Sequence, residues 1–279
     1  MRLVTYDAGA GPRVGALEGD QVVDLGFGGD MVEFIAAGAP AGDRSPVDGA
    51  RLLAPLRPRS LRDFLTFEGH LKNALSRLGR PIPDEWYDVP AYYKGMPDTV
   101  IGPDDEVPWP AWTDHLDHEL ELAAVIGPEP VRDVTGDAAA RAIFGYTIWN
   151  DISARDVQVR ELPVGMGPGK AKDWDGSNVL GPCIVTADEL GGGLAMRVRV
   201  NGELWGEDSS SSMHHTFADL VAYASQSQTL WPGEVLGSGT AAGGSGLELD
   251  RRLAPGDLVE LEVEGIGVLR NRIGQKGTA

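Results

Sequence analysis

The segment LDHELELAAVIG, residues 116–127, is the part of the chain that most restricts its fold. Glu119 and Glu121 alternate there with apolar residues, and side chains two positions apart on a strand point to the same face. The pattern predicts a strand with both carboxylates on one face and with Leu120 and Leu122 on the other. The same alternation is ordinary in a sheet with one face in water, so the segment alone leaves a solvated face and a binding site both open.

A further acid, Asp151, favours a binding site over a solvated face. It follows an apolar run within FGYTIWNDISARDVQ, residues 144–158, which is too hydrophobic for a surface loop. A buried carboxylate needs a partner, and neighbouring carboxylates repel one another unless a proton or a cation lies between them. Three carboxylates without a thiolate, at Glu119, Glu121 and Asp151, match a hard divalent ion such as Mg²⁺, Mn²⁺ or Ca²⁺.

The composition bounds the possible partners. A chain of 279 residues with 42% hydrophobic residues can form one large domain, or one domain with a small additional unit. The net charge of −18 argues against a nucleic-acid partner, whose phosphates would be repelled. We therefore expect a small-molecule substrate. A site for an anionic substrate must then be made locally positive by arginine, lysine or a metal ion.

The expected compartment is the cytoplasm. Cys183 is the single cysteine, so no disulfide can form within the chain, which fits a reducing environment. The start of the chain, MRLVTYDAGAGPR, lacks the apolar core of a signal peptide. No stretch approaches the roughly 18 apolar residues of a membrane span, so we expect no membrane partner.

Strand patterns outnumber helical ones and do not alternate with them regularly, which predicts an α+β, mostly β fold. Pro55 and Pro58 punctuate a linker-like stretch. We therefore expect a small N-terminal β-rich domain over 1–58 and a catalytic domain over 59–279. Strands are expected at 3–6, 14–17, 21–25, 143–150, 196–200, 203–205, 235–236, 258–263 and 267–271. Helices are expected at 31–37, 67–78, 136–142 and 217–225, and Asn201-Gly202 predicts a hairpin turn.

Two glycine-rich stretches are candidate binding loops. Residues 163–181 read as one long loop that carries Lys172, and long loops in compact domains are often functional. The GK[ST] ending of a phosphate loop is absent there. In GSGTAAGGSGLEL, residues 237–249, backbone N–H groups such as that of Gly239 and the hydroxyl of Thr240 could hold a carboxylate or an oxyanion. The composition equally allows a flexible turn, and the loop leads into a strand-like run with Glu248.

The histidines have ordinary readings as well. His70 lies beside the apolar side of the expected helix over 67–78, where a structural histidine is common. His115 and His118 could bind zinc together with Glu119, but residues three apart on a strand face opposite ways, and the HExxH helix motif is absent. We therefore do not expect a zinc site.

Six ordered segments together resemble the fumarylacetoacetate hydrolase superfamily. They are DFLTFEGH (63–70), ELELAAVIG (119–127), GYTIWNDISARDVQ (145–158), GKAKDWDGSNVLGP (169–182), TLWPGEVLGSGT (229–240) and LAPGDLVELEVEGIGVLRNRIG (253–274). The resemblance covers about residues 60–272. It implies the mixed β-sandwich roll of the fumarylacetoacetase C-terminal domain, usually assembled as a homodimer.

The resemblance also implies roles for individual residues. By similarity, the metal carboxylates are Glu119, Glu121 and Asp151, with Asp63 as a fourth acid found in fumarylacetoacetases. His70 matches the water-activating histidine, and Glu248 matches the glutamate that orients it. Arg155, Gln158 and Lys172 match the residues that hold substrate oxygens or the developing charge in this family. Tyr93 matches a substrate-contacting residue of the family, and so does Thr240, which follows Gly239 in the second glycine-rich loop.

This pattern implies a Mg²⁺- or Mn²⁺-dependent hydrolase that cleaves a carbon–carbon bond in a diketo acid of the fumarylacetoacetate, fumarylpyruvate or acylpyruvate type, in the catabolism of aromatic compounds. Leu65 and Leu162 stand where fumarylacetoacetases carry substrate-binding tyrosines, which predicts a less polar acyl group. Two alternatives stay open: a 2-oxo-acid isomerase, tautomerase, hydratase or decarboxylase on the same scaffold, and a catalytically silent binding protein.

Overall fold

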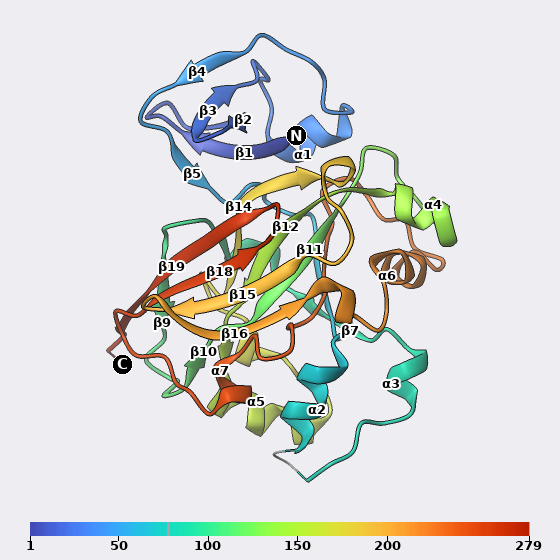
Figure 1. Ribbon diagram of the computed structural model, residues 1–279, viewed down its shortest axis with the longest axis vertical. Helices are drawn as coiled ribbons and strands as arrows, with labels where there is room; N and C mark the ends of the chain where they lie inside the picture. The colour runs from blue at the N-terminus through green and yellow to red at the C-terminus, as the bar shows by residue number, and fades with distance from the viewer. Residues whose placement is uncertain (77–78, 279) are drawn as a thin grey trace.

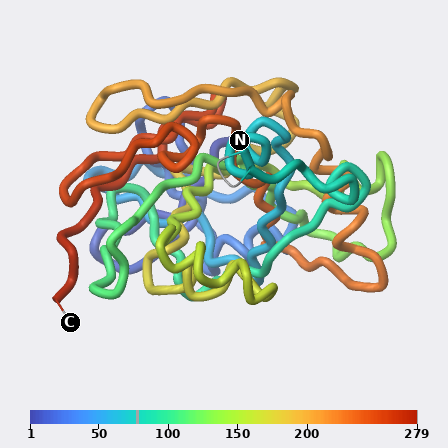
Figure 2. Tube along the Cα trace, turned by 90° about the horizontal axis from the view of Figure 1, so that it is seen from below, coloured from blue at the N-terminus to red at the C-terminus, as the bar shows by residue number. Residues whose placement is uncertain are grey.

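The computed structural model describes residues 1–76 and 79–278. The prediction of a mostly β fold is confirmed, with two large sheets and short helices at their edges. Figure 1 shows a small N-terminal lobe above a larger body, with α2, α5 and α7 gathered at the end of the body away from the lobe. Figure 2 looks onto that end of the molecule.

The N-terminal segment forms a sheet extension rather than a separate layer. Its antiparallel strands follow the order β4-β3-β2-β1, and β1 also pairs with β5. Their bounds are β1 Arg2–Asp7, β2 Pro12–Glu18, β3 Gln21–Asp24, β4 Ser45–Val47 and β5 Arg51–Leu53. Helix α1, Met31–Ala36, begins with a capping box between Asp30 and Glu33. Because β1 pairs with β14 of the body, one sheet runs through both parts of the chain.

The body continues this sheet in the order β14-β12-β11-β17-β6-β7. These strands are β14 Asn178–Thr186, β12 Ile143–Asp151, β11 Leu120–Ile126, β17 Val235–Gly237, β6 Leu61–Phe64 and β7 Tyr92–Gly95. Every residue of β11 is buried. The expected strand therefore exists, but it lies inside the protein, and the reading of a solvated face is wrong.

A second sheet covers one side of the core in the order β16-β15-β18-β19-β9. Its strands are β16 Glu203–Ser209, β15 Ala195–Val200, β18 Leu258–Val263, β19 Gly267–Lys276 and β9 Glu106–Trp109. Burial alternates along β15 and β18, so one face packs inward and the other meets water. The predicted hairpin is confirmed: Asn201 and Gly202 both have positive φ, at 51° and 80°.

Three further helices agree with the predicted positions. They are α2 Glu68–Ser76, α4 Gly136–Arg141 and α6 Phe217–Ala224. The last two residues of the helix expected over 67–78 lie outside the described residues. Within α2, His70 is the buried residue, while Leu71, Ala74 and Leu75 are only half-buried. The helix is therefore attached to the body mainly through its histidine side.

The structure corrects two expectations from the glycine-rich stretches. β14 begins at Asn178, so the end of the loop expected over 163–181 is a strand. The run containing Glu248 is not strand-like but forms the short helix α7, Gly246–Leu249. A further helix was not predicted: α5, Arg155–Glu161, follows directly after the apolar run.

The remaining short elements are α3 Glu85–Asp88, β8 Val100–Ile101, β10 Leu116–Asp117, β13 Ser153–Ala154 and the 3₁₀ turns η1 Pro97–Thr99, η2 Leu162–Val164, η3 Lys170–Lys172, η4 Ala187–Glu189 and η5 Ser210–Ser212.

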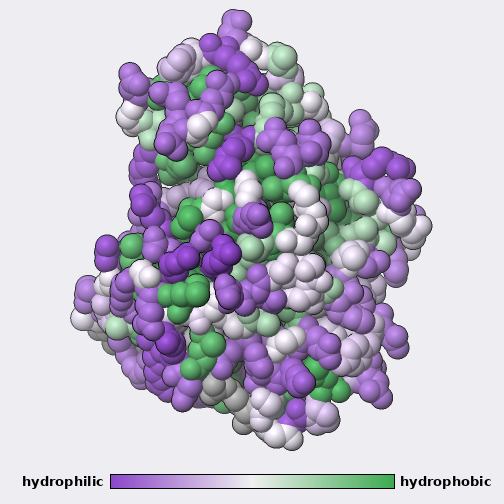
Figure 3. Space-filling view, viewed as in Figure 1, coloured by the Kyte–Doolittle hydropathy of each residue, from purple (hydrophilic) through white to green (hydrophobic). Residues whose placement is uncertain are grey.

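Hydrophilic residues cover most of the face shown in Figure 3, as the net charge of −18 leads one to expect. In the described part of the chain, no helix has the length and apolar character that crossing a bilayer would require.

Candidate active site

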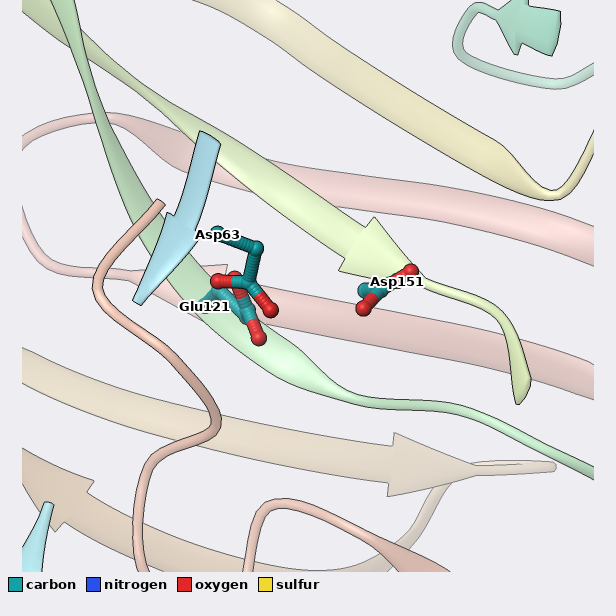
Figure 4. A group of neighbouring side chains, drawn as sticks. All are labelled: Asp63, Glu121 and Asp151. Atoms are coloured by element: carbon teal, nitrogen blue, oxygen red, sulfur yellow. The ribbon is translucent and has the colours of Figure 1, made fainter. Parts of the chain in front are cut away.

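Three buried carboxylates from three strands meet at one point of the main sheet. They belong to Asp63 on β6, Glu121 on β11 and Asp151 at the end of β12, and one oxygen of each lies within 4.8 Å of the others. Figure 4 shows the three side chains directed into the same space between the strands. Glu121 and Asp151 are two of the three acids that the sequence suggested as metal ligands, and Asp63 is the fourth acid implied by the resemblance.

The pairing register of the strands explains this convergence. Asp63 is paired with Gly237, and Gly237 is paired with Ala123, two residues after Glu121. Residues paired across neighbouring strands point to the same face, so Asp63 and Glu121 share one face. Gly237 keeps this face open, since a Cβ there would come within 2.8 Å of Asp63 Oδ1 and 2.7 Å of the ring of Trp149.

The electrostatics of this group call for a proton or a cation between the carboxylates. Burial, and then repulsion from Asp151, raise the pKa of Asp63 well above its usual value. Burial, and then the charges of Asp63 and Asp151, raise the pKa of Glu121 in the same way. Burial raises the pKa of Asp151 to about 6, although Lys172 opposes the shift. Within the described residues, both oxygens of Glu121 and Oδ1 of Asp151 are buried without a hydrogen-bond partner. An oxygen-only set of this kind fits Mg²⁺, Mn²⁺ or Ca²⁺.

Glu119 lies beside this group, but its carboxylate binds cationic side chains and does not join the three converging acids, although it was expected to be a metal ligand. It precedes β11 by one residue, and its carboxylate forms ion pairs with Lys172 and with Arg155, whose Nη1 is 2.7 Å from Glu119 Oε1. Burial opposes ionisation of Glu119, but the charges of Lys172 and Arg155 outweigh it and hold its pKa well below the usual range. The oxygens that converge are therefore those of Asp63, Glu121 and Asp151, with Glu119 turned toward the cations.

Lys172 is buried, although it lies in the glycine-rich stretch that was expected to form a loop. Its Nζ donates hydrogen bonds to both Glu119 and Asp151. Burial lowers the pKa of Lys172, but the charges of Asp151 and Glu119 more than compensate, so its pKa lies above the ordinary value. Lys172 therefore supplies a fixed positive charge at the edge of the carboxylate group.

His70 and Glu248 come together from α2 and α7. Nδ1 of His70 lies 2.9 Å from Oε2 of Glu248, and both side chains are almost fully buried. Burial raises the pKa of Glu248, but the contact with His70 and further donors, the N–H of Gly243 and the amide of Asn73, lower it overall. At this distance an ionised carboxylate, which can only accept hydrogen bonds, favours a proton on Nδ1 of His70. In a neutral imidazole the lone pair then lies on Nε2.

The residues expected to contact the substrate have the following surroundings. The hydroxyl of Tyr93 donates a 2.6 Å hydrogen bond to Asp151 Oδ2, and the Nη1 of Arg155 lies 3.0 Å from Gln158 Oε1. Thr240 is buried in the segment after β17. Gly239, with φ 79°, donates its N–H to Asp63 Oδ1 at 3.1 Å, so this N–H orients a carboxylate of the protein rather than facing a ligand.

One residue at the site was missed by the sequence analysis. Asp117 is 1% exposed, and Nε of Arg155 donates to its Oδ2 at 2.8 Å. Its position beside Glu119 is the signal that could have drawn attention to it. The histidines considered for zinc, His115 and His118, lie outside the carboxylate group; the His118 ring packs 5.6 Å from that of Trp205.

Comparison with known proteins places this site in a family. The model of the fumarylacetoacetate (FAA) hydrolase C-terminal family matches residues 60–274. The chain belongs to the fumarylacetoacetate hydrolase family. A second model, described as Rv2993c-like, N-terminal, matches residues 1–55. Membership confirms the resemblance found in the sequence and makes the chain an enzyme of this superfamily.

Individual relatives of this fumarylacetoacetate hydrolase family member are named for different reactions. A human mitochondrial oxaloacetate tautomerase is 34% identical over 69% of this chain and 60% of its own length. The structure of a fumarylacetoacetate hydrolase from Exiguobacterium antarcticum is 28% identical, with a TM-score of 0.83 over 98% of this chain and 99% of that one. A 5-carboxymethyl-2-hydroxymuconate delta-isomerase structure from Mycobacterium smegmatis is 32% identical, with a TM-score of 0.79 over 99% and 100%.

Proposed function

We propose that this chain is a divalent-metal-dependent hydrolase that cleaves a carbon–carbon bond in a 1,3-diketo acid of the acylpyruvate type. The observation that carries the proposal is the buried contact between His70 Nδ1 and Glu248 Oε2, at 2.9 Å. It lies beside Glu119, since Ser245 pairs with Glu119 and donates its hydroxyl to Glu248 Oε2 at 3.0 Å. A positioned base next to a metal site is the arrangement that water activation requires.

Asp63, Glu121 and Asp151 would hold the ion, with Glu119 as a fourth acid beside them. When bound, Mg²⁺ or Mn²⁺ would polarise the keto oxygens of a chelating diketo acid. The unpartnered oxygens of Glu121 and Asp151 support this assignment, because buried charges without partners are otherwise very unfavourable.

The chain's own residues supply the proton transfers. Nε2 of His70 takes a proton from water, and the resulting hydroxide adds to the carbonyl carbon of the acyl group. Glu248 stabilises the imidazolium that forms. The bond between this carbon and the neighbouring CH₂ then breaks, the electron pair leaves as the enolate of a 2-oxo acid, and a proton returned to carbon gives the neutral ketone. The products are two carboxylic acids.

Three polar side chains would stabilise the enolate charge. Lys172 and Arg155 are both buried and remain charged, since nearby carboxylates raise the pKa of each above its ordinary value. Gln158 accepts a hydrogen bond from Arg155, which leaves its amide N–H groups for the substrate. Cationic donors in a buried site stabilise developing negative charge strongly.

The segment formed by α5 and η2 supports an apolar acyl group. Arg155, Val159 and Leu162 are spaced at i, i+4 and i+7, so they share one side of this helical segment. Val159 and Leu162 are 62% and 49% exposed although they are apolar. A substrate anchored near Arg155 would extend along them, and a distal carboxylate would find no hydrogen-bond donor on either side chain.

A tautomerase or isomerase is the second candidate. The names of the human oxaloacetate tautomerase and the M. smegmatis isomerase favour it. The same His70 base would then remove a proton from a substrate carbon and return it elsewhere, without adding water.

One experiment separates the two reactions. Acylpyruvates and oxaloacetate would be incubated with the enzyme and Mg²⁺ or Mn²⁺ in H₂¹⁸O and, separately, in D₂O, with products identified by mass. Hydrolysis places one ¹⁸O in the acid released from the acyl group and yields a second acid. Deuterium exchange or isomerised product without cleavage would refute the hydrolase and support the tautomerase. Glu248→Gln, which keeps the size of the side chain but not its charge, is the matched variant for either reaction.

We also propose that the enzyme works as a cytoplasmic homodimer, and that residues 1–58 and 59–279 are its two domains. The match of separate family models to 1–55 and 60–274 supports the division. Light scattering coupled to gel filtration tests the dimer, and a monomer mass at working concentration would contradict it.

A further inference from the structure

The carboxylate of Asp117 connects two parts of the candidate site that come from distant segments. On one side it binds Arg155, with Nε and Nη2 both 2.8 Å from Oδ2. On the other side it accepts the backbone N–H groups of Gly246 at 2.9 Å and Leu247 at 3.0 Å, which form the first turn of α7. The same turn carries Glu248.

The fit around this carboxylate is tight. Asp117 is 1% exposed and Arg155 is 3% exposed. A Cβ at position 246 would come within 2.7 Å of Asp117 Oδ1 and of the carbonyl oxygen of Arg251, so glycine allows α7 to approach the carboxylate. A buried charge that is fully hydrogen-bonded fixes its donors in place, because releasing any of them would leave the charge uncompensated.

We propose that Asp117 is a positioning residue, which sets the place of Glu248, and through it the orientation of His70, while holding Arg155 against Glu119. The chain of contacts runs from the guanidinium through one carboxylate to α7 and on to the imidazole. The two ends are the base and the charge-stabilising arginine of the proposed reaction. The inference rests on the proposed function for its catalytic consequence, whereas the coupling between Asp117 and His70 can be measured without any substrate.

The first test is spectroscopic and uses the whole protein. The chain has five histidines, and a ring Nδ1–H bonded to a carboxylate gives a proton resonance far downfield. The resonance of His70 is assigned as the one that disappears in Glu248→Gln. We expect Asp117→Asn to shift or broaden it. An unchanged resonance in a folded Asp117→Asn protein would overturn the proposal.

A matched control separates coupling from general support of the loop. Asp208 binds the segment between β17 and α7, where it accepts the N–H of Ala242 at 2.8 Å, but it does not bind Arg155 in the described structure. Asp208→Asn should leave the His70 resonance in place. If it shifts the signal as much as Asp117→Asn does, the effect is a loss of loop stability and the proposal fails. Should Asp117→Asn not fold, Gly246→Ala tests the same link from α7, because its Cβ would come within 2.7 Å of Asp117 Oδ1.

The second test is kinetic. Asp117→Asn should lower kcat about tenfold to a hundredfold, as removal of a supporting carboxylate typically does, with a much smaller change in KM. The double variant with Glu248→Gln should lose less activity than the product of the two single losses, because residues that act as a unit are not additive. Fully additive losses would overturn the coupling. Mn²⁺ affinity, followed by calorimetry, should change little, and a large loss would show that Asp117 supports the metal group instead.

The outcomes distinguish this inference from the proposed function. If the wild-type enzyme cleaves no diketo acid but the His70 resonance responds to Asp117→Asn, the hydrolase assignment is wrong and the positioning role is supported. If the enzyme cleaves diketo acids and the resonance does not respond, the hydrolase assignment is supported and the positioning role is wrong.

Discussion

Nδ1 of His70 lies 2.9 Å from Oε2 of Glu248. This contact joins helix α2, in the first third of the chain, to helix α7, near its end. The carboxylate fixes the tautomer of the imidazole and leaves Nε2 as a base. Next to it, a group of buried acids lacks partners for several of its oxygens. The two features are adjacent but chemically separable, so each can be altered without the other.

Replacing Glu248 by glutamine should reduce kcat by roughly a hundredfold to a thousandfold, within the range for loss of general-base catalysis. The glutamine keeps the size of the side chain but cannot stabilise an imidazolium. Steady-state kinetics on an acylpyruvate would show the loss. Mn²⁺ affinity serves as the control and should be unchanged, because Glu248 is not one of the converging acids. Retention of near-full activity would contradict the hydrolytic mechanism.

Replacing Glu121 by glutamine should abolish tight metal binding, since it removes the charge of the acid whose oxygens are both unpartnered. In the wild type, a metal at about one hundred times its Kd should stabilise the fold by about 2.7 kcal/mol. Thermal melts with and without Mg²⁺, and with EDTA, check this. An equal metal-induced rise in the Tm of Glu121→Gln would show that the ion binds elsewhere.

The metal-free protein should lose stability as the pH rises from about 4 to about 6. Burial and the charge of Glu119 raise the pKa of Asp151 to about 6, against roughly 4 in an unfolded chain. A raised carboxyl pKa means that the folded state binds the proton more tightly, so ionisation costs stability as the pH climbs through this interval. Asp63 and Glu121 shift in the same direction. Urea titrations across this range in EDTA measure the effect, and saturating Mg²⁺ should remove it; stability that rises steadily with pH in EDTA would contradict it.

Replacing Leu162 by tyrosine should shift substrate preference toward diketo acids whose acyl group ends in a carboxylate. The hydroxyl would give that carboxylate a donor, and one such hydrogen bond to a charged group is worth about 1.5–3 kcal/mol. The measurement is the ratio of kcat/KM for fumarylpyruvate and acetylpyruvate. Leu162→Phe is the matched control, because it adds the ring without the hydroxyl. If both variants change the ratio equally, shape rather than hydrogen bonding decides the preference.

Replacing Asp24 by asparagine should destabilise the N-terminal lobe by about 1 kcal/mol. Hydrogen bonds from Arg13, at 2.5 and 3.0 Å, outweigh the effect of burial and hold the pKa of Asp24 well below its usual range. The Arg13 side chain is 44% exposed, so solvent screens much of the pair. Because the folded pKa is lowered, this contribution is present above about pH 4 and is lost as the pH falls. Denaturant titrations at pH 7 and pH 3 measure it, with the exposed Asp20→Asn as control; equal effects at both values would contradict the assignment.

The amino-acid sequence by itself determined the features that depend on neighbours along the chain. Alternation predicted β11, the apolar run predicted β12 with Asp151 at its end, and Asn201-Gly202 predicted a hairpin turn. These patterns work because side-chain periodicity and backbone φ preferences act over a few residues. They failed for α7, where a short glycine-flanked run has too few residues to distinguish helix from strand.

The tertiary structure decided which charges meet. Asp63 faces Glu121 because the register of β6, β17 and β11 places both on one face. The carboxylate of Glu119 turned to Lys172 and Arg155, although two-residue spacing treats Glu119 and Glu121 alike. Periodicity fixes the face on which a side chain lies, but its partner comes from distant segments. The balance of burial and charge that sets each pKa therefore exists only once those segments have packed together.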